Sequence, residues 1–232
     1  MQQTTKPAPA AQKEESKPPV PPPEFEEGVI AGMDAAGLVR ILTDAGVPEF
    51  QKAKACQRTG ELGVKEAVPA LSALLGHEHL STYARYGLEP IADPSADAAL
   101  RAALSKVKGN LLIGVINSIG KRRDAEAGPV LVKMMHGSDA DIARAAAEAL
   151  GHIGGVPAMK ELKAALPKTT GLTKMAVADA CLVCAERLLE DGKRDEALAL
   201  YASMSASDTP KPARLAAMAA IIREETSISR PR

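Results

Sequence analysis

Apolar residues recur at intervals of three and four positions from about residue 34 onward, which is the spacing expected of helices with one buried face. The first such pattern follows Asp34, a residue type whose side chain accepts hydrogen bonds from the free amides at a helix start. Leu38, Ile41 and Leu42 then form an apolar stripe, and Gly46 ends it. The pattern predicts a helix between Asp34 and Gly46.

The rest of the chain reads as imperfect copies of one helix-turn-helix unit. The turns of the first and fourth copies, 60–63 and 151–154, superimpose without a gap. The turns 87–90 and 117–120 superimpose when two and three extra residues, respectively, are allowed after them. Each copy then has an apolar pair spaced i,i+4 on its second helix: Leu71 and Leu75, Leu100 and Leu104, Leu131 and Met135, Leu162 and Leu166.

The first turn position is occupied by Gly60, Gly87, Asn117 and Gly151. Glycine, and next asparagine, is the residue type that best adopts the left-handed conformation closing a helix. We therefore expect these four residues to end the first helix of each unit with a positive φ.

A fifth unit has a longer first helix, from Met175 to Leu189, and turns at Gly192. A sixth first helix follows Pro210 and has no partner helix after it. Because an array of repeats needs a polar outer face at its end, we expect either that this last helix caps the array or that the array continues in a longer protein.

Residues 1–28 differ in composition from the rest. Seven of the seventeen prolines lie between Pro7 and Pro23, and such a segment is extended and has too little apolar surface to fold. We predict a disordered tail that acts as a spacer, with binding to a polyproline-recognising groove as the alternative. A spacer after a removed signal would suit an exported protein, so we favour an exported or periplasmic location over the cytoplasm.

Composition narrows the class of fold and partner. The chain has 232 residues, 46% of them hydrophobic but only 2% aromatic, with no Trp, which favours closely packed Ala- and Leu-rich helices over a β-sandwich. Lys plus Arg and Asp plus Glu number 29 each, so the net charge is 29 − 29 = 0 and gives no general attraction to nucleic acid. No apolar run approaches the roughly 18–20 residues of a membrane span.

The segment Asp141–Gly154, with Val68–Leu71 and Val130–Leu131 as second-helix matches, resembles the short bacterial HEAT-like repeats named after phycobilisome lyases. The resemblance covers residues 49–167 best, and residues 56–124 are also similar to uncharacterised exported proteins of planctomycete-type bacteria. It implies a right-handed α-solenoid with a concave binding surface. Members of the family are scaffolds, adaptors and occasionally enzymes.

Histidines and cysteines are the candidate metal ligands. HEAT-like deoxyhypusine hydroxylases bind two irons through several His-Glu pairs, and this chain resembles them only at His77-Glu78, with His79 beside the pair. We expect His77 and His136 to cap the carbonyl ends of second helices, and keep His77, Glu78 and His79 as weak metal candidates. The remaining candidates, Cys181 and Cys184, lie in an Ala-rich helical pattern and are expected to be buried packing residues. We assign no cofactor.

The densest polar and aromatic cluster lies in one first helix. Tyr83, Arg85 and Glu89 are candidate partner-binding residues, because exposed Tyr and Arg dominate protein interfaces. Tyr86 aligns with Leu150 and is expected to fill the core. The basic run 121–123 is expected to be a solvated loop in the third turn.

Together these patterns predict an all-α right-handed solenoid of about five helical pairs over residues 29–232. The predicted function is a non-catalytic protein-interaction or scaffold module that works as a monomer, with an unknown protein partner and without nucleic acid. The alternative is an enzyme or enzyme accessory, of a metal-binding hydroxylase or lyase type, that uses the ridge formed by His77 and His79. No catalytic residue is assigned.

Overall fold

A computed structural model describes residues 30–206 and 208–228 of the chain. The predicted Pro-rich tail lies outside the described residues. All regular elements in the described part are helical, which confirms the all-α class. The α-helices are α2 (Ala35–Thr43), α3 (Glu49–Leu62), α4 (Val68–Leu74), α5 (Ser81–Leu88), α6 (Pro94–Ala103), α7 (Gly109–Arg122), α8 (Gly128–Met135), α9 (Ala140–Ile153), α10 (Gly155–Ala165), α11 (Gly171–Glu190), α12 (Arg194–Ser203) and α13 (Lys211–Ile228). Short 3-10 turns are η2 (Lys65–Ala67), η3 (Ala125–Ala127) and η4 (Leu166–Lys168).

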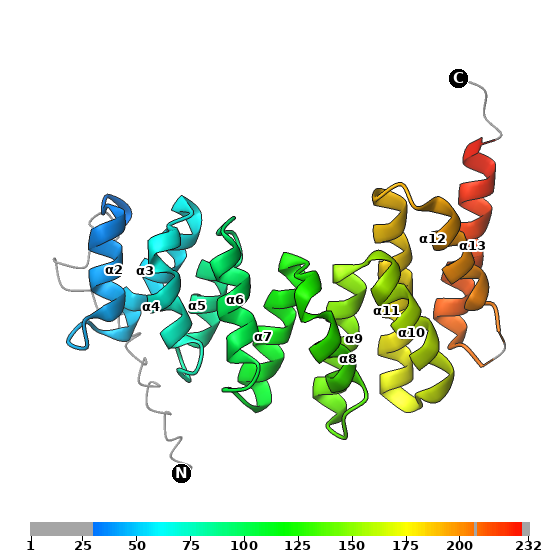
Figure 1. The fold of residues 1–232 in the computed structure, drawn as a ribbon, viewed down its shortest axis with the longest axis horizontal. Coiled ribbons are helices and arrows are strands. Elements are labelled where there is room, and N and C mark those ends of the chain that lie inside the picture. Colours follow the sequence, from blue (N-terminus) through cyan, green and yellow to red (C-terminus); the bar gives the residue numbers. More distant parts are fainter. Residues whose placement is uncertain (1–29, 207, 229–232) are drawn as a thin grey trace, which may run out of the picture.

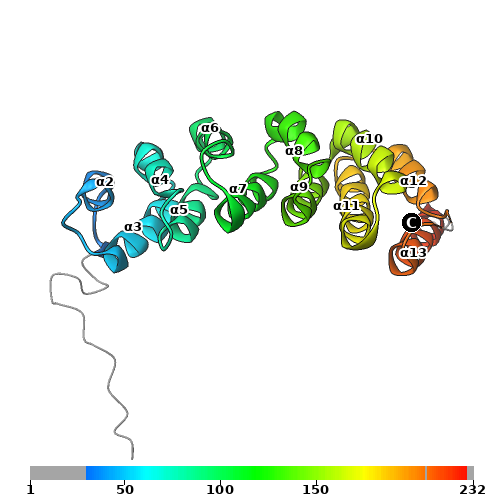
Figure 2. The same ribbon diagram turned by 90° about the horizontal axis from the view of Figure 1, so that it is seen from below.

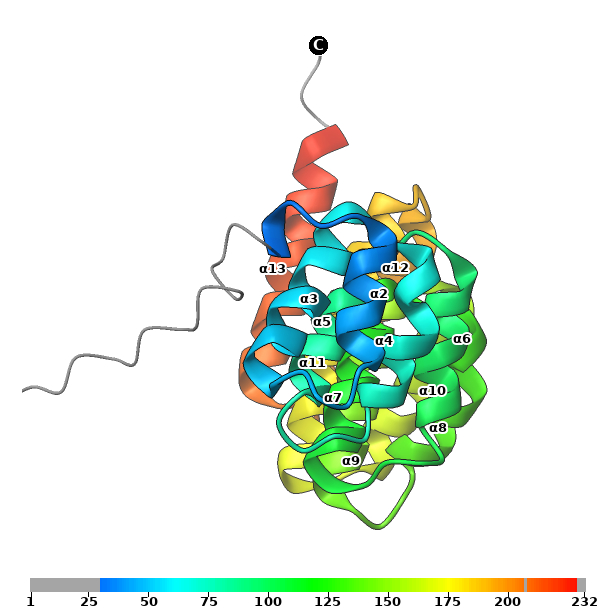
Figure 3. The same ribbon diagram turned by 90° about the vertical axis from the view of Figure 1, so that its left-hand side faces the viewer.

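The helices form two layers that run along the whole array (Figure 1). One layer holds the odd-numbered helices α3 to α13 and the other holds the even-numbered helices α2 to α12, as the end view shows (Figure 3). The array curves, and Figure 2 shows the odd-numbered helices on its inner side. The first helix of each repeat therefore lines the concave surface.

Aspartates start several of these helices. Asp34 accepts a hydrogen bond of 2.8 Å from the backbone N of Gly37, which confirms the predicted start of α2. Asp93 and Asp139 accept from backbone amides at the starts of α6 and α9 in the same manner. Each carboxylate satisfies amides that the helix itself leaves free.

The glycines at the first turn position have a different role from the one that the sequence suggested. Gly60, Gly87 and Gly151 lie inside helices, and none has a positive φ. Instead they allow successive odd-numbered helices to approach closely: a Cβ on Gly151 would lie 2.8 Å from the carbonyl oxygen of Ala180 on α11. Gly60 and Gly87 meet each other between α3 and α5 in the same way. The prediction of left-handed residues at these positions is wrong, because helix contact selects glycine there.

Left-handed residues lie three positions after Gly60 and Gly151. Gly63, Arg123, Gly154 and Gly192 have φ values of 64°, 58°, 71° and 74°, and each follows the last residues of an odd-numbered helix. Arg123 therefore takes the place of Gly63 in the third copy, and Gly120, not Asn117, takes the place of Gly60. Leu131 and Met135 then follow at eight and twelve residues without any insertion, so the three extra residues inferred from the sequence do not exist.

The second copy has the two extra residues that the sequence predicted. No described residue between α5 and α6 has a positive φ, so this turn has no left-handed closure. The turn is held by a side chain from the next repeat.

The last part of the array follows the predicted pattern. Leu200 and Met204 on and beside α12 are fully buried, as expected of the fifth apolar pair. α13 packs on both α11 and α12, and its buried face is made of Ala213, Ala217 and Ala220.

Candidate functional site

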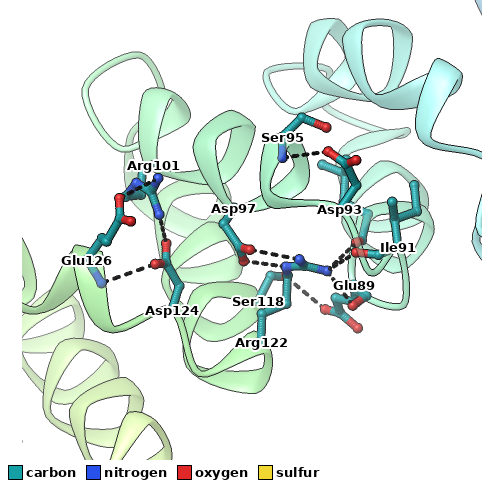
Figure 4. A network of polar contacts seen from close by, with 11 residues as sticks. Glu89, Ile91, Asp93, Ser95, Asp97, Arg101, Ser118, Arg122, Asp124 and Glu126 are labelled. Carbon is teal, nitrogen blue, oxygen red and sulfur yellow. Dashed lines mark hydrogen bonds and ion pairs between the residues drawn. The ribbon is translucent and has the colours of Figure 1, made fainter.

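The densest polar network of the described residues joins the second repeat to the third (Figure 4). At its centre, Arg122 at the end of α7 forms a two-pronged ion pair with Asp97 on α6, with Nε–Oδ1 and Nη2–Oδ2 distances of 2.6 and 2.9 Å. Its Nη1 donates to the carbonyl oxygens of Leu88, Glu89 and Ile91 at 2.9, 2.8 and 2.7 Å. The planar guanidinium can donate to the Asp97 carboxylate and to these carbonyl groups at the same time, because its N–H groups point to both sides.

This geometry explains how the long second turn is held. The carbonyl groups at the end of α5 have no hydrogen-bond donors within the helix. The turn also lacks a left-handed residue, whose backbone amide would usually donate to such carbonyl groups. Arg122 supplies the missing donors, and its side chain is only 9% exposed. The expectation of a solvated loop at 121–123 is wrong, because Lys121 and Arg122 belong to the last turn of α7 and Arg122 is buried against α6.

A second ion-pair cluster lies at the outer side of the same junction. Asp124 caps η3 by accepting from the backbone N of Glu126, and it pairs with Arg101 of α6 at 2.6 Å. Arg101 also pairs with Glu126 at 2.9 Å. The hydrogen bond to Asp124 raises the pKa of the Arg101 guanidinium, although partial burial opposes the shift. The pair fixes α6 against η3.

Two of the three residues predicted to bind a partner lie in the inner side of this junction. The Glu89 side chain is 7% exposed, accepts from the Ser118 hydroxyl at 2.8 Å and pairs with Lys121 Nζ at 2.6 Å. Arg85 donates to the same hydroxyl at 3.2 Å. Its guanidinium occupies the space where a Cβ on Gly114 would stand, at 2.7 Å. Polar side chains thus separate α5 from α7, whereas glycine brings α3 close to α5, α7 close to α9 and α9 close to α11.

The aromatic residue exposed above this junction is Tyr86. Its side chain is 53% exposed, so the prediction that it fills the core is wrong. The ring lies 5.8 Å from the Arg85 guanidinium carbon and 6.0 Å from Lys121 Nζ, distances at which a cation is attracted to an aromatic face. Tyr83, one turn earlier on α5, is also exposed. The repeat alignment missed this exposure because the residue aligned with Tyr86, Leu150, is buried.

Two hollows flank Lys121 on the inner layer. The first, of about 370 Å³, is lined by Tyr86, Glu89, Pro90 and Lys121. The second, of about 460 Å³, is lined by Asn117, Gly120, Lys121, Glu148, Ala149, His152 and Arg187. We call Tyr86, Lys121 and these two hollows the inner recognition surface. It spans α5, α7, α9 and α11, so four repeats contribute to it.

A larger hollow lies between α8 and α10. It has about 920 Å³, and it is lined mainly by apolar residues of η3, α8 and α10, among them Pro129, Val132, Val156 and Pro157. Lys133 and Lys160 are also among its lining residues.

The histidines predicted as weak metal candidates form a different arrangement. Glu49 at the start of α3 pairs with His79 Nδ1 at 2.9 Å and with His77 Nε2 at 3.5 Å. His77 Nδ1 accepts from the backbone N of His79 and Leu80 at 3.3 and 3.4 Å. His77 therefore holds the turn that precedes α5, not the carbonyl end of α4, and the predicted capping of α4 is wrong. Among residues 30–206 and 208–228, no three His, Cys, Asp or Glu side chains are grouped so that they could hold a metal ion.

Cys181 and Cys184 have the buried positions that the sequence predicted. Cys181 and Cys184 are fully buried in α11, and Cys56 is fully buried in α3. Burial raises the pKa of all three thiols to about 12. They are packing residues that stay protonated near neutral pH.

None of the described helices is both long enough and apolar enough to cross a membrane.

Comparison with known proteins agrees with this architecture. No protein of curated function matches the sequence. Residues 96–182, from α6 into α11, match the family model described as HEAT repeats. Residues 96–182 of this helical array are therefore similar to HEAT repeats.

Proposed function

We propose that this chain is a non-catalytic protein-interaction or scaffold module that binds a partner on its concave layer. HEAT repeats suggest such a role, because each unit adds one helix to a continuous surface. The observation that carries the proposal is the half-exposed Tyr86 ring on the inner layer, which lines one of the two hollows that flank Lys121 and lies above a buried polar junction. The whole array, residues 29–232, acts as one surface in this proposal.

Tyr86 has the properties of an interface anchor. Tyrosine offers a large contact area at a small entropic cost, and tyrosine and arginine are enriched among the residues that dominate binding energy. The residues beneath the ring are already held: Arg85 by Ser118, and Glu89 by Ser118 and Lys121. A rigid support means that little order must be gained on binding.

The three residues singled out from the sequence divide into two roles. Tyr83 contributes exposed area beside Tyr86, while Arg85 and Glu89 position Tyr86 and Lys121 from below. The partner surface would offer an apolar or aromatic group for the first hollow and a carboxylate for Lys121. His152 and Arg187 add cationic or hydrogen-bonding groups in the second hollow.

The finer family assignment is also part of the proposal. The match of Asp141–Gly154 to the consensus supports the phycobilisome-lyase type of HEAT-like repeat, and the Pro-rich segment supports an exported location.

Affinity capture with the purified full chain, followed by mass spectrometry, tests the proposal. Tyr86→Ala should weaken capture of the partner at least about tenfold, the range of an anchor residue. Phe50→Ala is the matched control, since Phe50 is also an exposed aromatic residue with a cation, Lys54, 5.9 Å from its ring. Equal loss in both variants, or no loss in Tyr86→Ala, contradicts a recognition surface at Tyr86. A specific turnover by the isolated chain contradicts the non-catalytic role.

A further inference from the structure

The last described helix, α13, has apolar side chains on two opposite faces. Its buried face, Ala213, Ala217 and Ala220, packs on α11 and α12. The opposite face carries Leu215, Met218 and Ile222, which are 53%, 47% and 60% exposed. Exposed large apolar residues in a row mark an interaction surface.

No described element covers this face. At the other end of the array, no large apolar residue of α2 is exposed, whereas three of α13 are. The apolar row is thus a particular property of α13.

The row continues into a charged residue at each end. Lys211, Leu215, Met218, Ile222 and Glu225 are spaced by four, three, four and three residues, which places them on one side of the helix. All five side chains are exposed. This is the spacing of a seam along which one helix packs against another.

The order of these residues is symmetrical about Met218. Lys211 lies seven residues before it and Glu225 seven residues after it, while Leu215 and Ile222 lie three before and four after. When a second copy of the helix lies antiparallel, Met218 faces Met218 of the other copy and Leu215 lies beside the other Ile222. Each Lys211 then meets the other copy's Glu225, so the seam complements itself in both shape and charge.

We infer that two copies of this chain associate through an antiparallel pairing of their α13 helices. A two-fold symmetric interface requires a surface that complements itself, and the seam from Lys211 to Glu225 meets that requirement. A parallel pairing would place Lys211 against Lys211 and Glu225 against Glu225. The antiparallel pairing departs from the monomer expected from the sequence.

The association is weak, because a single pair of helices buries less area than a standard protein interface. A dissociation constant of roughly 10–100 μM corresponds to such a contact. The dimer would present two inner recognition surfaces at once, which raises the apparent affinity for a partner with two binding sites. The inference does not depend on the proposed function, since α13 lies outside the inner recognition surface.

Sedimentation velocity of the full chain over about 5–300 μM tests the pairing, a range set by the expected dissociation constant. We expect the mass to rise from 24.2 kDa toward twice that value. Met218→Arg places two like charges at the symmetry axis and should raise the dissociation constant at least about tenfold. Leu172→Arg is the matched control on another exposed apolar residue, on α11, and it should leave association unchanged.

Charge exchange identifies the partner surface. Lys211→Glu and Glu225→Lys should each weaken self-association, because each places like charges opposite one another. A mixture of the two single variants should associate again, since every Glu then meets a Lys. A Glu at the start of α13 and a Lys near its end both interact favourably with the helix dipole. The fold should therefore be retained, and circular dichroism checks this.

Two results overturn the inference. One is a wild-type chain that remains at 24.2 kDa throughout the concentration range. The other is a dimer that Met218→Arg does not weaken, or whose charge variants fail to associate when mixed.

Discussion

Replacing Arg122 by alanine tests how the second and third repeats are joined. The change removes five hydrogen bonds: two to the Asp97 carboxylate and three to the carbonyl oxygens after α5. It leaves Asp97 without its guanidinium partner, and it removes the side-chain donor to the carbonyl oxygens of Leu88, Glu89 and Ile91.

The magnitude follows from the burial of the two partners. Breaking a buried ion pair by removing one partner costs about 3–5 kcal/mol. Arg122 is only 9% exposed, but the Asp97 side chain is 24% exposed, so water can reach the carboxylate that remains. We therefore expect Arg122→Ala to lower the free energy of unfolding by about 3 kcal/mol, toward the lower end of that range.

Chemical denaturation followed by circular dichroism measures this loss. Arg144→Ala is the matched control, since Arg144 also pairs with an aspartate, Asp141, but on the surface of one helix. Such surface pairs contribute about 0–1 kcal/mol. Because repeats contact only their neighbours, hydrogen exchange should increase first in residues 88–97. A loss in Arg122→Ala no larger than that in Arg144→Ala would refute the reasoning.

Further changes test the helix contacts and the buried thiols. Gly151→Ala should lower the free energy of unfolding by about 1–3 kcal/mol, because the new Cβ would lie 2.8 Å from the backbone of α11. Gly128→Ala is its control: no atom lies within 4 Å and φ is −45°, so a gain of about 0.5 kcal/mol is expected; equal effects in denaturation would argue against the close contact. The three cysteines should react with a thiol reagent at neutral pH only after unfolding, and fast reaction of the folded chain would contradict their burial. Their raised pKa means that the unfolded chain loses these protons first, so stability should fall as pH rises from about 9 toward about 12, and a pH-independent midpoint over that range would disagree.

The turn glycines show how a correct sequence pattern can have a different physical cause. Periodic glycines at the first turn position were visible, and both a left-handed turn and a close helix contact select glycine. A left-handed closure is a local property, whereas a close contact depends on which helix lies next to it. Gly151 faces Ala180, which is 29 residues away in the chain. A pattern of neighbouring residues therefore cannot reveal this contact.

The candidate site illustrates the same division. Tyr83, Arg85 and Glu89 stood out in the sequence as a polar and aromatic cluster, but Arg85 and Glu89 turn toward Ser118 on the neighbouring repeat. The repeat alignment places Tyr86 in the core because it aligns with Leu150, which is buried, whereas Tyr86 itself is 53% exposed. The sequence predicts a solvated Arg122. Its partners include backbone carbonyl groups of another repeat, and residue types do not reveal such contacts.

The sequence by itself determined the helical class, the repeat, the buried apolar pairs and the buried cysteines, because these depend on spacing and residue type within one unit. Only the tertiary structure decided which polar side chains are buried, which aromatic ring is exposed and which face of α13 has no neighbour. Those properties arise where one repeat meets the next. The curvature and the surface of the array depend on these junctions, whose contacting residues lie about 23–34 positions apart in the chain.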